Sequence, residues 1–177
     1  MRKIRFAAAL LALCLAVSLT GCGDKTKDWV LDEETFFLVM TNMQYYPEQY
    51  LDSEIEFDCF MYDLKDVNGD SHICGVRKCS SGYGCTCGND TIIGFLLNYD
   101  GKLPAPRHQS DDDPDKAWVH LRGRLAGADK ETIEINAFTS DGEIDPGRTE
   151  QIVFLVFDVE ECTEIEDASG LQYYVTK

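Results

Sequence analysis

Hydrophobic and polar residues follow three different patterns along this chain. The first 22 residues join a basic start to an apolar run from Phe6 to Val17. Apolar residues then recur at helical spacing from Phe36 to Met43, which predicts one helix with Asp32 as its N-terminal cap. From Glu54 onward, apolar and polar residues alternate one by one in several short stretches, which is typical of half-buried β-strands. Residues 91–99 are instead a nearly continuous apolar run, which predicts a central strand.

The chain after residue 53 predicts five or six main strands, besides a short edge strand. In the first of them, Ile55, Phe57 and Cys59 share one face, and Asn68-Gly69 predicts a hairpin turn after it. The remaining predicted strands cover residues 71–78, 91–99, 118–125, 132–138, 152–159 and, as an edge, 171–175. Short strands at close spacing after a single helix predict a mainly β fold, a small barrel or sandwich.

The N-terminal segment ends in the residues Leu19-Thr20-Gly21-Cys22. Basic residues, a short apolar run and small residues in this order are typical of a secretory signal, and the run is too short to span a membrane as a helix. The segment resembles a bacterial lipobox, which implies a lipoprotein acylated on Cys22, palmitate included, and cleaved before it. The alternative is an ordinary signal peptide with a chance cysteine. We expect a signal peptide at 1–21, a lipidated tether at 22–31 and one domain at 32–177.

The charge of the chain is strongly negative, with a formal net charge of −16. Removing the leader removes Arg2, Lys3 and Arg5 and no acid, so the mature chain carries 13 basic and 32 acidic residues, a net charge of −19. Such a charge repels nucleic acid, which excludes that class of partner. A diacylated cysteine supplies stable membrane anchoring. We therefore expect the extracytoplasmic face of the cell membrane as its location.

The order of segments between residues 46 and 125 carries a family resemblance. The segments are a Pro-Glu-x-Tyr turn, a strand end, a cysteine pair before an aspartate and a Trp-Val strand: Tyr46 to Leu51, Phe60 to Tyr62, Cys85 to Asp90 and Trp118 to Gly123. This stretch resembles the OB-fold domain of the YcgQ-type proteins, membrane-associated partners of predicted permeases in Firmicutes. The resemblance implies an OB-like barrel of five to six strands. The chain differs from that family by its lipobox and its additional cysteines.

Six cysteines follow Cys22 in the chain: Cys59, Cys74, Cys79, Cys85, Cys87 and Cys162. Exported proteins meet oxidising conditions, so an even number of cysteines favours structural disulfides. Cys59 and Cys162 lie on separate predicted strands and are candidates for a disulfide across the β fold. The other four would then close local loops.

The clustered cysteines leave two other interpretations open. Tetrahedral zinc, or copper, would take the four thiolates, with the histidine just upstream as a further candidate ligand: Cys74, Cys79, Cys85, Cys87 and His72. Their spacings differ from those of paired zinc knuckles. A redox pair, Cys85-Thr86-Cys87, is the second interpretation, without the common Cys-x-x-Cys spacing. Zinc is therefore the one cofactor to consider, and none is expected if the cysteines form disulfides.

One face of the strand predicted at 118–125 is a candidate ligand surface. His120, Arg122 and Arg124 project from it, and OB barrels bind ligands on a strand face, so an anionic ligand would fit there. The alternative is that the three side chains pair with nearby carboxylates. The segment from Asp66 to Asp70 begins like a calcium loop but lacks the glycine and glutamate of one, and a hairpin turn accounts for it better.

The sequence contains no Gly-x-Ser-x-Gly, phosphate-binding or His-Glu-x-x-His motif, so we expect no enzyme. We predict a membrane-anchored lipoprotein that acts as a non-catalytic binding or accessory module for an unidentified protein or small ligand. The alternative function is a zinc- or copper-binding lipoprotein that serves a transport system through the cysteine cluster. The redox state of the clustered cysteines would discriminate the two.

Overall fold

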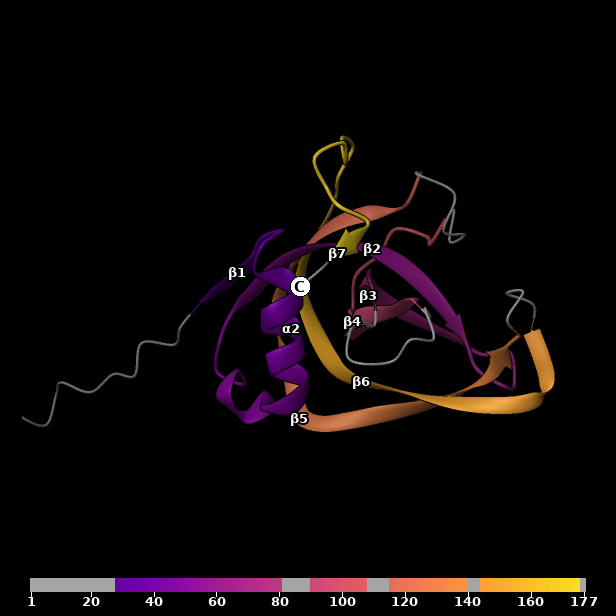
Figure 1. Ribbon diagram of the computed structural model, residues 1–177. Coiled ribbons are helices and arrows are strands. Elements are labelled where there is room, and N and C mark those ends of the chain that lie inside the picture. The colour runs from indigo at the N-terminus through magenta and orange to yellow at the C-terminus, as the bar shows by residue number, and fades with distance from the viewer. Residues whose placement is uncertain (1–27, 81–89, 108–114, 140–143, 176–177) are drawn as a thin grey trace, which may run out of the picture.

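The computed structural model describes residues 28–80, 90–107, 115–139 and 144–175. Strands dominate the described part of the chain, with one α-helix and one short 3-10 turn (Figure 1). The elements are β1 (Trp29–Leu31), α2 (Phe36–Tyr45), η1 (Pro47–Gln49), β2 (Ile55–Lys65), β3 (Ser71–Ser80), β4 (Asp90–Asn98), β5 (Trp118–Phe138), β6 (Ile144–Glu164) and β7 (Tyr174–Val175). The prediction of a mainly β fold with one helix before the main strands is confirmed.

Five strands close into a hydrogen-bonded ring, in the order β2, β5, β6, β4, β3 and back to β2. Four of these pairings are antiparallel, and β4 with β6 is parallel. β1 extends the sheet beside β2, and β7 extends it beside β3, both in parallel. The result is a mixed sheet that curves back on itself.

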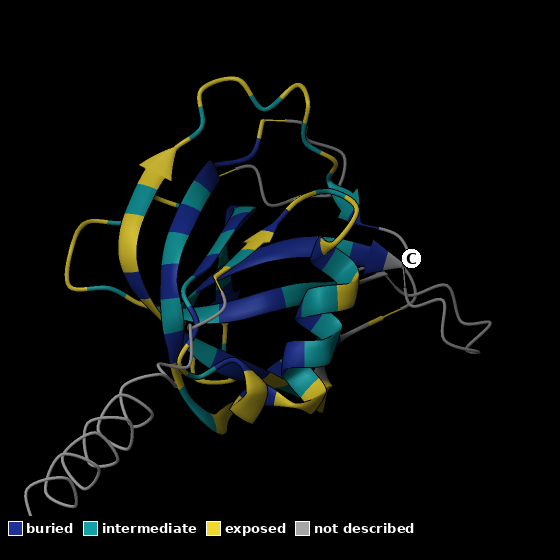
Figure 2. Ribbon diagram, turned by 90° about the vertical axis from the view of Figure 1, so that its left-hand side faces the viewer, coloured by how far each residue is buried: buried dark blue, intermediate teal, exposed yellow. Residues whose placement is uncertain are grey.

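The main core fills the inside of this ring. The inward face of β2 supplies Ile55, Phe57, Cys59 and Met61, all buried as the alternation predicts. Three phenyl rings meet there from β2, β4 and β6: Phe57, Phe95 and Phe157, with centroids 5.1–5.5 Å apart. Helix α2 covers one side of this core with Phe36, Met40 and Met43 (Figure 2).

A second core lies on the opposite face of β2 and β3. Phe60, Leu64, Cys74 and Val76 point to that face, because side chains alternate along a strand. The far halves of β5 and β6 cover them with the side chains of Ile133, Ile135 and Phe154. The backbone N–H of Val67 donates to the carbonyl of Glu134 and ties this hairpin to the turn after β2.

Irregular pairing lets the β5–β6 hairpin contribute side chains to both cores. The β5–β6 register shifts at three points, between Arg122 and Gly123, between Leu125 and Lys130, and between Asn136 and Ala137. Such irregularities bend strands and increase their twist. At the first shift the backbones approach so closely that a Cβ on Gly123 would lie 2.1 Å from the carbonyl oxygen of Asp158. Only glycine fits this position without a backbone movement.

Three details differ from the sequence-based expectations. Trp29–Leu31, expected within the tether, form β1 because they pair with Ile55 to Phe57. The strands expected at 118–125 and 132–138 are parts of the single long strand β5. Asp32 accepts hydrogen bonds from the backbone N–H groups of Glu34 and Thr35, so it caps the turn that leads into the helix, which itself begins at Phe36.

The structure contains no helix, within the part of the chain that it describes, long and apolar enough to cross a membrane.

Candidate functional site

His120 lies on the outward face of β5, beside two carboxylates of β2. Its Nδ1 atom lies 2.8 Å from Oδ1 of Asp58 on the neighbouring strand β2. Its Nε2 atom lies 3.8 Å from the carboxylate of Glu56. The imidazole is 42% exposed, but both of its nitrogens face acidic oxygens. This position therefore suits the pairing that we gave as the alternative to ligand binding.

Arg122 and Arg124 continue the same row. Arg122 Nη1 lies 3.3 Å from the carboxylate of Glu54, and Nη2 pairs with Glu161 on β6. Arg124 Nε lies 3.1 Å from the carboxylate of Glu160, and its Nη2 reaches Glu54 at 3.5 Å. The hydrogen bond to Glu161, and then that to Glu54, raises the pKa of Arg122.

These contacts define a charge ladder, by which we mean the row of His120, Arg122 and Arg124 with their carboxylate partners across β2, β5 and β6. Its cations are matched by acids on both flanking strands. An anionic ligand would have to displace these carboxylates before binding. The ladder is therefore a poor anion site, although its three basic residues share one face as predicted.

The cysteines form no disulfide among the residues that the structure describes. Cys59, Cys74 and Cys162 are free thiols. Cys59 and Cys162 both contact the main core, but β5 runs between their strands. Two strand spacings amount to about 9.6 Å, whereas disulfide-bonded Cα atoms are about 4.4–6.8 Å apart. The predicted disulfide across the fold is therefore wrong.

The cluster of four cysteines is also divided by the fold. Cys74 belongs to the second core and Cys79 to the main core, on opposite faces of β3. Five residues of strand separate them by about 17 Å. Two sulfurs on one zinc ion lie only about 4 Å apart. Cys74 and Cys79 thus cannot ligate the same metal, while Cys85 and Cys87 lie outside the described residues.

His72 takes part in the hairpin turn instead of in a thiolate site. Its Nε2 atom lies 3.5 Å from Oδ2 of Asp66. The other oxygen of Asp66 accepts hydrogen bonds from the backbone N–H groups of Asn68 and Asp70, at 2.8 and 2.9 Å. Gly69 adopts a φ of +87° in this turn, so the predicted hairpin is confirmed. Within the described ranges, no group of three or more His, Cys, Asp or Glu residues is placed to hold a metal.

Burial makes the thiols of Cys59, Cys74 and Cys162 weak nucleophiles. Desolvation raises the pKa of Cys74 to about 12, with a further contribution from Asp63. Desolvation also raises the pKa of Cys59 well above its usual range, and that of Cys162 to a smaller extent. Thiolates, not thiols, carry out redox and nucleophilic chemistry. These three cysteines are packing residues at neutral pH.

Arg77 forms the most buried charged site among the described residues, and this site was not predicted from the sequence. Its side chain is 2% exposed. Nη1 donates to both carboxylate oxygens of Glu33, at 2.6 and 2.7 Å, and to the carbonyl of Gln172 at 2.9 Å. The guanidinium carbon lies 5.0 Å from the ring centres of both Phe36 and Trp118. We call this group the Arg77 cluster.

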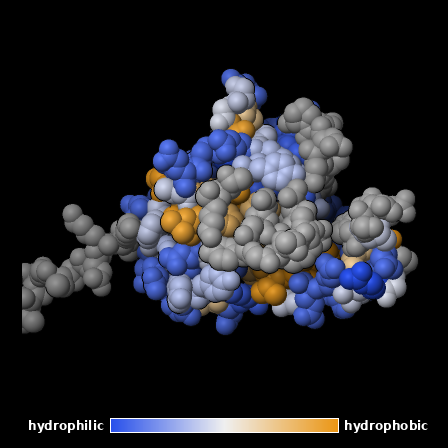
Figure 3. All heavy atoms as spheres, viewed as in Figure 1, coloured by the Kyte–Doolittle hydropathy of each residue, from blue (hydrophilic) through white to orange (hydrophobic). Residues whose placement is uncertain are grey.

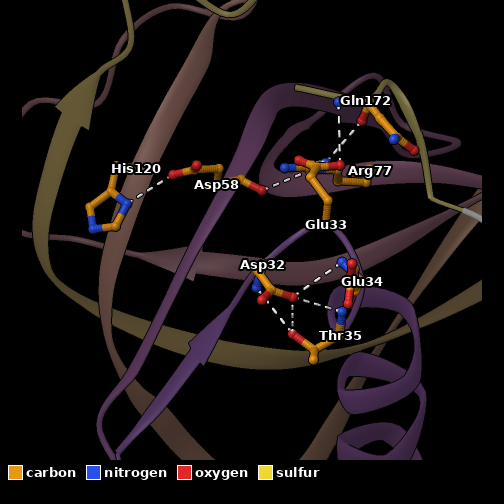
Figure 4. A network of polar contacts seen from close by, with 8 residues as sticks. All are labelled: Asp32, Glu33, Glu34, Thr35, Asp58, Arg77, His120 and Gln172. Carbon is orange, nitrogen blue, oxygen red and sulfur yellow. Dashed lines mark hydrogen bonds and ion pairs between the residues drawn. The ribbon is translucent and has the colours of Figure 1, made fainter. Parts of the chain in front are cut away.

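The Arg77 cluster joins distant parts of the chain at one point (Figure 4). Glu33 precedes α2, and Gln172 belongs to the C-terminal segment, 44 and 95 residues away from Arg77. Arg77 Nε also donates to the backbone carbonyl of Asp58, whose carboxylate lies 2.8 Å from Nδ1 of His120 on the ladder. One residue of β2 therefore connects the cluster with the charge ladder. Alternation on β3 places Arg77 on the face of Cys79, which was the available signal for its burial.

Comparisons with known proteins give one match. A family model described as the DUF1980 C-terminal domain matches residues 19–140, which reach from the end of the N-terminal segment to the end of β5. No curated protein and no solved structure matches the chain. The matched region covers more than half of the sequence and includes α2, β2, β3 and β4. The chain therefore belongs to the DUF1980 C-terminal domain family.

Proposed function

We propose that this protein is a lipoprotein, acylated on Cys22 and held on the extracytoplasmic face of a membrane, with an OB-like barrel that acts as a non-catalytic accessory module. The observation that carries the anchor is the order of basic residues, short apolar run and Leu19-Thr20-Gly21-Cys22. Residue 22 lies seven residues before β1, so the acyl chains would hold the folded body close to the bilayer.

The pairing order of the strands supports the OB-like description. An OB-fold is a five-stranded, partly open Greek-key barrel. Here five strands form a closed ring in which β2, β3 and β4 follow one another, β4 pairs in parallel with β6, and β5 returns to β2. Helix α2 covers one side of the core inside the ring.

The state of the reactive groups supports an accessory role over a catalytic one. The described thiols with raised pKa values are protonated at neutral pH. The basic residues of the charge ladder are matched by acids, and Arg77 is enclosed between two rings and Glu33. Groups that satisfy one another in this way stabilise a fold and are unavailable to a substrate.

The test is the chemical state and location of the chain produced with its leader in a bacterium that processes lipoproteins. Intact mass should show cleavage before Cys22 and the added acyl chains, and the protein should sediment with membranes. The Cys22→Ala variant should lack the acyl mass and leave the membrane fraction. Retention of this variant in membranes, or an unmodified Cys22 in the original chain, would reject the anchor.

A further inference from the structure

Helix α2 carries hydrophobic side chains on the face that it turns away from the core. Phe36, Met40 and Met43 are buried beneath it. Leu38 and Tyr45 point the other way and are 71% and 74% exposed, the largest values among the large hydrophobic residues that the structure describes. Tyr46, directly after the helix, is 54% exposed. We call these three exposed residues the α2 outer face.

The composition of α2 is unusual for a surface helix. None of its ten residues is charged, although 27% of the residues in the chain are. Surface helices normally place charged residues opposite their buried stripe, whereas α2 has only the uncharged polar residues Thr41, Asn42 and Gln44 and places Leu38 and Tyr45 there. Figure 3 shows hydrophobic side chains that reach the surface in the region of α2, beside the hydrophilic surface that surrounds them. The α2 outer face is therefore a candidate contact surface for another molecule.

The geometry of the face fits a flat surface. Leu38 and Tyr45 are seven residues apart, which is about 10.5 Å along a helix axis and brings them to the same side. The rings of Tyr45 and Tyr46 are 6.4 Å apart and extend this side beyond the end of the helix. A helix laid along a plane would place all three side chains on it at once. Tyrosine is enriched where proteins meet the membrane–water interface, and an exposed leucine there adds buried apolar area.

The position of α2 in the chain, close to Cys22, favours the bilayer as the partner that covers the α2 outer face. Cys22 lies seven residues before Trp29, a length of on the order of 25 Å when fully extended. Only four residues separate β1 from α2, and Figure 1 shows both elements on the same side of the ring. An anchored chain thus keeps α2 within reach of the lipid at all times. Since the body carries a strong negative charge, an uncharged face is also the one that a membrane surface repels least.

We propose that the α2 outer face, Leu38 with Tyr45 and Tyr46, rests in the headgroup region of the membrane to which Cys22 is attached, so that the ring of strands is held in one orientation. This inference rests on the proposed lipid anchor. In this orientation the far end of the β5–β6 hairpin, where Ile144 and Val153 are exposed, stays accessible to other partners.

The test is hydroxyl-radical footprinting of the chain on vesicles and in solution. One sample is the exported chain reconstituted into phosphatidylcholine vesicles. A second vesicle sample carries Cys22→Ser and a hexahistidine segment before residue 23, and it is bound to vesicles that contain a nickel-chelating lipid. Each sample is compared with the same protein in solution. We expect Leu38, Tyr45 and Tyr46 to be oxidised several-fold more slowly on vesicles than in solution. Ile144 and Val153 serve as internal controls of similar exposure and should react equally in both states.

The variants Leu38→Glu and Ile144→Glu form a matched pair, since each replaces an exposed hydrophobic residue of a helix or strand by a charged one. The first should remove the protection of Tyr46 on vesicles, and the second should leave it unchanged. Equal oxidation of the α2 outer face in both states, protection of Ile144 instead, or protection that appears in solution as the protein concentration rises would each overturn the inference. The last outcome would identify a second copy as the occupant.

The nickel-attached sample separates this inference from the proposed anchor. Its attachment point is fixed whether or not Cys22 is acylated in cells. An exported chain without acyl mass would reject the lipoprotein proposal, while the footprint of the nickel-attached chain would still decide whether the α2 outer face meets the bilayer.

Discussion

The Arg77 cluster and the charge ladder contain the same kinds of side chain in opposite surroundings. In the cluster, one guanidinium is enclosed by Glu33, two aromatic rings and two backbone carbonyls. In the ladder, Arg124 is 41% exposed and its partner Glu160 is 43% exposed. Exposed pairs gain little, because water screens both charges, whereas breaking a buried pair leaves an uncompensated charge. Burial, more than the number of contacts, decides which arginine the fold depends on.

The largest effect should follow from Arg77→Ala. It removes the contacts with Phe36 and Trp118 and takes the guanidinium away from Glu33, which keeps only the backbone N–H of Gln172, and from two backbone carbonyls. We therefore expect the free energy of unfolding to fall by about 3–5 kcal/mol. Urea denaturation followed by far-ultraviolet circular dichroism measures it. Arg124→Ala is the matched control and should cost much less. Equal losses in the two variants would contradict the comparison.

A smaller effect is expected for Glu33→Gln, which keeps the shape of the side chain and removes its charge. The guanidinium of Arg77 then loses a charged acceptor but keeps its carbonyl partners, and Glu33 is 28% exposed, so water compensates in part. We expect a loss of about 2 kcal/mol in urea denaturation. The exposed counterpart, Glu160→Gln, should be nearly neutral. A larger loss for Glu160→Gln would place the stabilising charges on the ladder.

The buried thiols should make the free energy of unfolding depend on pH. The pKa of Cys74 is raised to about 12 in the folded protein, above the ordinary value of an unfolded thiol. The unfolded chain therefore loses this proton first. The contribution of Cys74 to stability is constant below about pH 8.5 and falls by about 1.4 kcal/mol per pH unit above it, until the folded thiol also ionises.

Urea denaturation of the reduced protein between pH 8 and pH 10.5 measures this dependence. The Cys74→Ala variant should show a shallower decline than the original chain, because it lacks that proton. The half-exposed Cys162 gives the control, since Cys162→Ala should change the slope less. Identical slopes for the original chain and Cys74→Ala would contradict the assigned burial of the thiol.

The smallest effect is expected on the ladder itself. Arg124→Ala should lower the free energy of unfolding by less than about 1 kcal/mol, and the difference from the original chain should shrink in 1 M salt, where charges are screened within about 3 Å. Thermal denaturation at low and high salt measures it. A loss that does not change with salt would mean that Arg124 acts through packing.

Much of the fold around the charge ladder could be predicted from neighbouring residues along the chain. The alternation of Ile55, Phe57 and Cys59 predicted the inward face of β2, and Asn68-Gly69 predicted the turn to β3. The excess of acid made pairing an evident alternative for the basic residues of β5. The disulfide between Cys59 and Cys162 was predicted wrongly, because spacing along the chain says nothing about how many strands separate two cysteines in the ring.

The sequence by itself determined much of the local structure of this protein: most of the strands, where the helix and the hairpin turn lie, and which side chains share a face. Only the tertiary structure decided what covers each face. Phe60 and Leu64 are buried because the far half of the β5–β6 hairpin folds over them. Arg77 is buried because its partners arrive from 44 and 95 residues away. Periodicity reports the direction of a side chain, whereas burial depends on contacts between segments that are distant in sequence.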